Sequence, residues 1–297
     1  MALNPWSECR FLTCSVLPVA SECECECPFC FSRSSISALA RERVTFDAAA
    51  LRDHLRWARD RGARRLVVTG GGEPLLRADD VVSIVRAGRE VFDEVACFTN
   101  AARLDRALAT RLRDAGLSYL CWSRHHWDDA RNRAVMGPAA PDLRDVIARA
   151  DGLTLRATCV MHRGGVEHRG DVERYVTELG AHGVAQFTFK HTYVAYERSV
   201  FRESEHDRWC RAHQIDDDPF DGEGEVLSTL PWGPTVRRWR GAQVCFYREP
   251  TPAWELENKL CRSTNLMADG RVYASLEDSR SLLYTLDGSS RRSLPVT

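Results

Sequence analysis

The sequence predicts an α/β protein built around a parallel β-sheet, followed by a smaller region after about residue 200. Short apolar runs typical of buried strands alternate with stretches of helical periodicity between residues 15 and 190. The connections between them are short, as in parallel strands joined by right-handed helical crossovers. A cysteine-rich loop after the first expected strand indicates that this sheet supports a metal site.

The first expected helix shows how each element is predicted. Asp47 is a suitable N-cap for a helix over residues 47–61, which places Leu51 and Leu55 on one face, and Gly62 ends it. The expected helices cover residues 47–61, 81–91, 104–115, 143–150 and 172–182. The expected strands cover residues 15–19, 66–69, 95–99, 117–123, 153–161 and 185–190, which makes six β/α units.

The pattern changes after residue 200. Residues 203–214 are expected to form a polar helix. Residues 216–242 contain an acidic run and then glycine, proline and tryptophan without a clear period, so we expect a loop-rich cover there. Residues 261–275 are predicted to form a hairpin that turns at Asp269–Gly270.

Composition limits the class of protein. The 297 residues contain 44% hydrophobic and 28% charged residues, and 41 basic and 42 acidic side chains leave a net charge of −1. This balance argues against nucleic acid or a membrane as partner. We expect a cytoplasmic protein with a core at residues 1–200 and a C-terminal extension at residues 201–297. In a reducing compartment its twelve cysteines indicate metal ligands or reactive thiols before disulfides.

The cysteine loop is the most informative stretch of the chain. Cys23, Cys27 and Cys30 have the spacing C-x3-C-x2-C, which allows one loop to ligate three irons of a [4Fe–4S] cluster. The fourth iron is then open to a cofactor or substrate. Cys25 offers an alternative set with Cys27 and Cys30 in a tighter spacing.

Two motifs resemble those of the radical S-adenosylmethionine (radical SAM) enzymes. One is the three-cysteine loop with an aromatic residue, Phe29, before its last cysteine. The other is the glycine-rich segment 70–74 after the second strand. The resemblance implies a partial (β/α)6 TIM barrel, a [4Fe–4S] cluster and SAM as cofactors. It also implies that Gly71, Gly72 and Glu73 bind the amino group of SAM.

Further SAM contacts follow from the same resemblance. Polar residues at strand ends are expected around SAM, here Thr99, Asn100, Ser123 and Arg124. A guanidinium forks well onto a carboxylate, so Arg124 or Arg156 is expected to pair with the SAM carboxylate. Ordinary structural ion pairs are the alternative for both arginines.

Polar clusters follow the fourth and sixth strands, on the face where a barrel has its active site. We interpret the first as substrate-binding rather than as a zinc site, because adjacent histidines rarely supply a whole tetrahedral site. The second has either a substrate-binding or a structural role. The clusters are His125, His126, Asp128 and Asp129, and Lys190, His191, Tyr193 and Glu197.

Two late cysteines bear on the type of reaction. The segment after Cys261 resembles the hairpin that holds auxiliary clusters in many radical SAM enzymes, but Ser275 stands where a further cysteine is expected. This departure makes a complete second iron–sulfur cluster doubtful, although a partial one is allowed. A thiol without iron is a candidate hydrogen-atom donor, and we assign Cys245 to this role, with Cys261 as the second choice.

Chain size and these C-terminal features resemble the radical SAM epimerases of aminoglycoside biosynthesis, the neomycin C epimerase family. The resemblance implies that a 5′-deoxyadenosyl radical takes hydrogen from a sugar carbon and that a thiol returns it from the opposite face. An electron donor such as flavodoxin or ferredoxin is implied as partner. Carboxylates and tryptophans within residues 197–257 suit a polycationic aminoglycoside, or form a solvated acidic loop with core tryptophans.

Three alternatives stay open. The first is a radical SAM enzyme that epimerises or cross-links a peptide, although such enzymes usually have a leader-binding domain and fuller auxiliary sites. The second is a radical SAM sugar dehydrogenase or dehydratase. The third is an iron–sulfur or zinc protein without catalysis.

Overall fold

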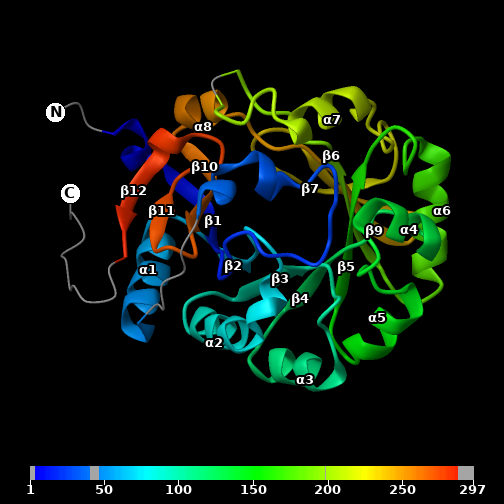
Figure 1. Cartoon of the computed structure of the whole chain (residues 1–297), viewed down its shortest axis with the longest axis horizontal. Helices are drawn as coiled ribbons and strands as arrows, with labels where there is room; N and C mark the ends of the chain where they lie inside the picture. Colours follow the sequence, from blue (N-terminus) through cyan, green and yellow to red (C-terminus); the bar gives the residue numbers. More distant parts are fainter. Residues whose placement is uncertain (1–3, 41–46, 198, 287–297) are drawn as a thin grey trace.

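The structure is a computed structural model that describes residues 4–40, 47–197 and 199–286. In these residues twelve strands form one sheet in the order β12-β11-β10-β1-β2-β3-β4-β5-β6-β9-β8-β7. The run from β10 through β1–β6 to β9 is parallel throughout, and short antiparallel strands flank it on both edges. The sheet curves into an open barrel with helices around its outside (Figure 1).

The six expected β/α units are present. Their strands are β1 (Arg10–Val16), β2 (Arg65–Val68), β3 (Glu94–Thr99), β4 (Tyr119–Ser123), β5 (Leu155–Met161) and β6 (Gln186–His191). The five helices expected between these strands are also present: α1 (Ala48–Asp60), α2 (Ala78–Arg89), α3 (Arg106–Asp114), α5 (Leu143–Ala150) and α6 (Arg169–Gly180). A further helix that the sequence did not predict, α4 (Asp129–Met136), precedes α5 in the connection between β4 and β5. The short 3-10 helices are η1 (Pro5–Glu8), η2 (Phe31–Ser34), η3 (Ile36–Leu39), η4 (Pro74–Arg77) and η5 (Ser279–Ser281).

The first helix forms for the reason that its sequence indicates. The Asp47 carboxylate accepts hydrogen bonds from the free backbone N–H groups of Ala49 and Ala50 at the start of α1. Leu51 and Leu55 are buried on its inner face. The prediction of this helix, including its cap, is confirmed.

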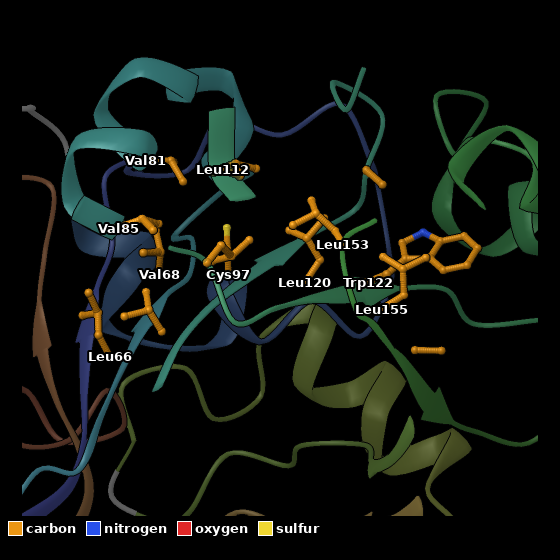
Figure 2. Close-up of a cluster of buried hydrophobic side chains, with 14 of the residues drawn as sticks. Leu66, Val68, Val81, Val85, Cys97, Leu112, Leu120, Trp122, Leu153 and Leu155 are labelled. Atoms are coloured by element: carbon orange, nitrogen blue, oxygen red, sulfur yellow. The ribbon is translucent and has the colours of Figure 1, made fainter. Parts of the chain in front are cut away.

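The main core lies between the sheet and its helices. Leu66 of β2, Cys97 of β3, Leu120 and Trp122 of β4, and Val85 of α2 all belong to this core (Figure 2). All five side chains are almost completely buried. Because side chains alternate along a strand, the residues between them face the concave side of the barrel.

The C-terminal part differs from the loop-rich cover that the sequence predicts. It contains α7 (Glu205–His213), β7 (Glu225–Thr229), β8 (Thr235–Trp239), β9 (Ala242–Tyr247), α8 (Pro252–Asn258), β10 (Leu260–Leu266), β11 (Arg271–Tyr273) and β12 (Leu282–Thr285). The expectation for residues 216–242 was wrong because β7 is an exposed edge strand and therefore has no apolar alternation. The hairpin at Asp269–Gly270 is confirmed, and Gly270 has the positive φ of 85° that such a turn favours.

Strands β9 and β10 are the two ends of the parallel run, and within the described ranges they do not pair with each other. Buried charges cross the seam between them. Lys190 at the end of β6 donates to Glu249 at 3.0 Å, and Arg262 of β10 binds the other oxygen of Glu249. Burial would raise the pKa of Glu249, but these two cations lower it to about 2. Side-chain ion pairs therefore connect the two ends of the parallel run, whose backbones are not hydrogen-bonded to each other in the residues that the structure describes.

We expect the stability of the fold to depend on pH through Glu277, a buried carboxyl group near this seam. Burial, with the nearby Glu249 and Glu255 carboxylates, raises the pKa of Glu277 to about 8 against the opposing effects of Arg262 and Tyr193. A group with a raised folded-state pKa stabilises the fold fully below its unfolded pKa, and this stability is lost as the pH rises to about 8. We expect Glu277→Gln to gain on the order of 1–3 kcal/mol over the parent between pH 4.5 and 8.5. Chemical denaturation across this range measures the effect, and the exposed Glu257→Gln is the control. Parallel curves for Glu277→Gln and the parent would contradict the prediction.

None of the helices in the described part of the chain is long and apolar enough to cross a membrane.

Candidate active site

The cysteine loop lies at the carboxyl end of β1 and presents three of its four thiols. Cys23 is exposed, and Cys27 and Cys30 are partly exposed, whereas Cys25 is buried against Met136. A side-chain hydrogen bond from Cys25 lowers the pKa of the Cys23 thiol to about 6, and the Cys25 backbone N–H also donates to its sulfur at 3.4 Å. The placement favours Cys23, Cys27 and Cys30 as ligands and makes Cys25 a support for Cys23.

These thiols fit a cluster better than a single metal ion. Among residues 4–40, 47–197 and 199–286, no three His, Cys, Asp or Glu side chains converge on one point as a mononuclear site requires. A [4Fe–4S] cube binds each thiolate through a different iron, so its ligands surround a larger volume. Burial raises the pKa of Cys27, and the neighbouring Cys30 and Cys23 thiols raise it further, as expected for three thiols grouped in one loop.

The glycine-rich segment packs directly on the cysteine loop. Gly71 N–H donates to Val19 O at 3.1 Å, and Glu73 N–H donates to Glu22 O at 2.8 Å. A Cβ atom on Gly72 would lie 1.9 Å from Glu22 O. The close approach of two backbones therefore requires glycine here, whatever ligand the segment also binds.

Glu73 joins the glycine segment to the end of β3. Its side chain is 3% exposed and accepts from Thr99 Oγ1 at 2.7 Å, Asn100 N–H at 2.8 Å and Leu75 N–H at 2.9 Å. Burial raises the pKa of Glu73 to about 7, although these hydrogen bonds oppose the rise. Asn100 Nδ2 in turn lies 3.6 Å from Cys23 Sγ. The structure thus brings Glu73, Thr99 and Asn100 together beside the loop.

Arg124 is placed differently from the prediction. Its side chain is completely buried, and Nη2 donates to Asp129 Oδ1 at 2.5 Å and to Trp127 O at 2.9 Å. The guanidinium also lies over the Trp122 ring, on the helix side of the sheet. This position does not support the assignment of Arg124 to the SAM carboxylate, because the alternation of side chains in β4 turns Ser123 to the concave face and Arg124 away from it.

The four members of the polar cluster after β4 do not share one site in the structure. His125 Nδ1 accepts from Val160 N–H at 3.0 Å, and its ring packs on Phe29 with a centroid distance of 4.7 Å. The other members have structural contacts: His126 packs on Trp127, Asp128 caps α4, and Asp129 binds Arg124. Only His125 of this set lies against the cysteine loop.

Phe29 has two aromatic neighbours from later in the chain: sequence reasoning missed His162 and considered Trp209 only among the tryptophans of residues 197–257 that suit an aminoglycoside. His162, after β5, and Trp209, of α7, have ring centroids 5.3 Å and 5.7 Å from that of Phe29. Their positions after strand β5 and on α7 give no motif to detect. With His125, these rings surround Phe29 of the cysteine loop.

The cluster after β6 is also divided. Lys190 belongs to the buried seam, and His191 Nε2 lies 3.4 Å from Asp216. Tyr193 packs edge-on against Phe31, the residue after Cys30. Glu197 is exposed. These contacts give the first three a structural role in the described residues.

The two late cysteines are far apart. Cys245 of β9 lies in register with Thr188 of β6, which pairs with Thr158 of β5 and through it with Ser123 of β4. Val244 and Phe246 face the helix-side core, so Cys245 faces the concave side. Cys261 instead pairs with Phe11 at the amino-terminal edge of the sheet, about 16 Å along β10 from its carboxyl end.

Cys261 packs against the Cys9 thiol, which raises the Cys261 pKa. It is fully buried in the main core and is not brought together with the other candidate residues. Its role as hydrogen donor is therefore not supported by its position. A second cluster that uses Cys245 and Cys261 together stays a prediction, which their separation disfavours.

An open parallel barrel with a three-cysteine loop at its carboxyl edge defines an iron–sulfur enzyme whose cluster has an iron open to a ligand. The Radical SAM superfamily model matches residues 17–176, which is more than half of the chain. The chain belongs to the radical SAM superfamily. Its cofactors are a [4Fe–4S] cluster and S-adenosylmethionine.

Comparisons with individual proteins agree with this family. The PqqA peptide cyclase of Streptomyces rochei is 27% identical over 169 residues, which is 56% of this chain and 45% of that protein. Streptococcus suis SuiB has been crystallised with S-adenosylmethionine and with its precursor peptide SuiA. The SAM-bound structure matches with a TM-score of 0.58 and 16% identity, over 90% of this chain and 60% of SuiB. The AdoMet-bound anSMEcpe structure matches with a TM-score of 0.55 and 12% identity, over 92% of this chain and 77% of that one.

The chain thus spans less than half the length of the curated relative and three-fifths of SuiB.

Proposed function

We propose that this chain is a radical SAM epimerase that inverts one carbon centre of a peptide residue, with Cys245 as the hydrogen donor. The observation on which the proposal rests is the place of the Cys245 thiol on the concave face, in one row with Ser123, Thr158 and Thr188. The peptide is supported by the relatives, because PqqA peptide cyclase is named for a peptide and SuiB binds its precursor peptide.

The environment of Cys245 suits a donor of hydrogen atoms. Burial raises the pKa of this thiol to about 11, so at neutral pH it keeps its S–H bond. Its side chain lies two residues, or about 7 Å, below the carboxyl end of β9. A substrate carbon held between the cysteine loop and the strand row that contains Cys245 would turn one face to the cofactors and the opposite face to the Cys245 thiol.

The residues have separate roles in this proposal. Cys23, Cys27 and Cys30 hold the cluster, while Phe29, Gly71, Gly72, Glu73, Thr99, Asn100 and Ser123 are candidates for SAM contacts. When bound, the cluster and SAM supply the radical that removes one hydrogen atom from a substrate C–H bond. Residues 1–200 hold the cofactors, and residues 201–297 cover the substrate and contribute Cys245.

Hydrogen return at Cys245 has a defined balance. The substrate carbon radical takes the hydrogen atom of the S–H bond on the face opposite to the one that lost it, and a new C–H bond forms as the S–H bond breaks. The sulfur radical left on Cys245 needs one electron and one proton. An electron donor such as flavodoxin or ferredoxin supplies the electron, and solvent supplies the proton.

The second candidate is an aminoglycoside epimerase with the same donor. A hollow of about 460 Å³ beside the end of β6 is lined by Asp216, Asp217, Asp218 and Asp221, which suit a polycation. Arg163 and Arg169 also line it, which reduces its negative potential. The named relatives favour the peptide, so we place the aminoglycoside second.

The test is turnover by anaerobically reconstituted, reduced protein in deuterated water, with a peptide library and an aminoglycoside panel as substrates. Cys245 exchanges its proton with solvent, so the product is expected to be the epimer, heavier than the substrate by one deuterium. Mass spectrometry and chiral analysis measure both features. A product lighter by two hydrogens would mean oxidation and would contradict the proposal.

Two variants sharpen this test. Cys245→Ala is expected to form 5′-deoxyadenosine at close to the parent rate but to yield no epimer, because only the second half-reaction needs the thiol. Cys261→Ala is the matched control and should retain the deuterated epimer. Normal epimer formation by Cys245→Ala would remove Cys245 from its role.

A further inference from the structure

The concave face below the cysteine loop contains an arginine whose charge is not matched by a carboxylate. Arg156 of β5 donates through Nε and Nη2 to Gln186 Oε1 at 3.1 Å and 3.0 Å, and through Nη1 to the Tyr119 hydroxyl at 3.3 Å. Both acceptors are neutral. The nearest carboxylate of this network, Glu94, accepts from the Tyr119 hydroxyl and is paired with Arg65. In the described residues Arg156 forms no ion pair.

The guanidinium also has donors to spare. A guanidinium has five N–H groups in a fixed planar fork, and the contacts above use three of them. The remaining two suit an anion with two oxygens, because such pairs form parallel charge-assisted hydrogen bonds. Arg156 is the second residue of β5, so its backbone lies about 16 Å below the carboxyl end of that strand, and its long side chain is only partly buried.

A second observation comes from the next residue on the same face. Thr158 is 4% exposed, and its Oγ1 is buried without a hydrogen-bond partner. Its neighbours Ala157 and Cys159 face the helix-side core, so Thr158 faces the concave side two residues above Arg156. A buried hydroxyl without a partner is unfavourable, and a ligand that forms a hydrogen bond with it would remove this cost.

Cross-strand register places both residues near Cys245. Arg156 pairs with Gln186 and, through it, with Gln243 of β9, while Thr158 pairs with Thr188 and, through it, with Cys245. Two strand spacings separate Thr158 from Cys245, which is about 10 Å between their backbones. A ligand bound to Arg156 and Thr158 would therefore share the concave face with the Cys245 thiol, within about two strand spacings of it.

We infer that Arg156 and Thr158 form a carboxylate-binding subsite that orients the substrate beside Cys245. The substrate class is then a molecule with a carboxylate close to the reacting carbon, such as an acidic side chain or the terminal carboxylate of a peptide. This inference rests on the proposed function, because that function identifies the ligand of the subsite as the substrate. A polycationic aminoglycoside has no group for this subsite.

The test compares two alkylating reagents of nearly equal size. Iodoacetate has a carboxylate and iodoacetamide a neutral amide, and both form an S–CH2 bond as iodide leaves and the thiol proton passes to solvent. The full chain with its cluster reconstituted is treated with each, and mass spectrometry follows labelling of Cys245. The ratio of the two rates reports anion binding beside the thiol, since any change in Cys245 reactivity itself cancels.

Arg156→Gln is expected to lower this ratio at least about tenfold, because one charge-assisted hydrogen bond contributes about 1.5–3 kcal/mol. Thr158→Val, which keeps the shape, should lower it about threefold, from the loss of a neutral hydrogen bond. Arg56→Gln, on the exposed side of α1, is the matched control and should leave the ratio unchanged.

A competition experiment on the parent protein keeps the test valid if Arg156→Gln fails to fold. Acetate should slow labelling by iodoacetate but not by iodoacetamide. Equal ratios in Arg156→Gln and the parent, equal effects of acetate on both reagents, or no labelling of Cys245 by iodoacetate would overturn the subsite. Labelling does not depend on turnover, so this failure is separable from a failure of hydrogen return, which Cys245→Ala reports.

Discussion

Replacing Cys23, Cys27 or Cys30 by serine is expected to abolish reductive cleavage of SAM, with no 5′-deoxyadenosine above the level of a protein-free control. Each thiolate is proposed to hold a different iron, and a serine hydroxyl is a poor ligand for a cluster that prefers sulfur. Loss of one ligand also exposes the cluster to solvent at the partly exposed Cys27 and Cys30 positions. The measurements are iron content per chain, visible absorbance after anaerobic reconstitution, and product formation by chromatography.

Cys25→Ala is the matched control for this series. Cys25 lies in the same loop but packs against Met136 and Ala140, and alanine retains the backbone N–H that donates to Cys23 Sγ. This variant should retain its iron and most of its SAM cleavage, although loss of the thiol hydrogen bond raises the Cys23 pKa toward its usual value. If Cys25→Ala lost the cluster while Cys23→Ser kept it, the ligands would be Cys25, Cys27 and Cys30.

Gly72→Ala is expected to have the second largest effect, through the loop rather than through a ligand. The new Cβ would lie 1.9 Å from Glu22 O and 2.6 Å from its carbonyl carbon, and neither backbone atom can rotate away. The cysteine loop must then move off the glycine segment and lose the hydrogen bond from Glu73 N–H to Glu22 O. We expect a loss of stability of at least about 3 kcal/mol, as for severe overpacking, together with loss of iron and SAM cleavage. Thermal unfolding and iron content measure these changes.

Gly170→Ala is the matched control for this steric effect. Gly170 lies in α6, and a Cβ atom added there would meet nothing within 4 Å, so Gly170→Ala should be neutral or stabilise the protein by about 0.5–1 kcal/mol. A Gly72→Ala protein that bound iron and SAM as the parent does would show that the two backbones are not held together as described.

Much of the fold follows from local pattern. The cap at Asp47, the apolar face of α1 and the turn at Gly270 are local features, and each was predicted at the right place. The edge strand β7 was missed because its exposed side chains show no alternation, and β9 was missed with it although Val244 and Phe246 are buried. Pairing with a distant strand, β6, stabilises β9, and a local window does not contain that partner.

The candidate site shows the same division. The cysteine spacing and the glycine segment determined the cluster loop and the superfamily, because both functions need fixed residue types at short separations along the chain. The direction of each side chain needed the tertiary structure. Arg124 and Ser123 are neighbours in sequence, yet the alternation of β4 and the Asp129 carboxylate hold Arg124 on the helix side.

The sequence by itself determined the chemistry that this protein can hold: three thiolates after the first strand, and a tight glycine turn with an acidic residue after the second. Only the tertiary structure decided which other residues share that space. It placed Cys245 on the concave face and Cys261 at the amino-terminal edge of the sheet, and it put Thr158 in the row of Cys245 and Arg156 in the next row below it. The physical reason is that strand register joins residues far apart in sequence, and a shift of one residue exchanges the two faces of a strand.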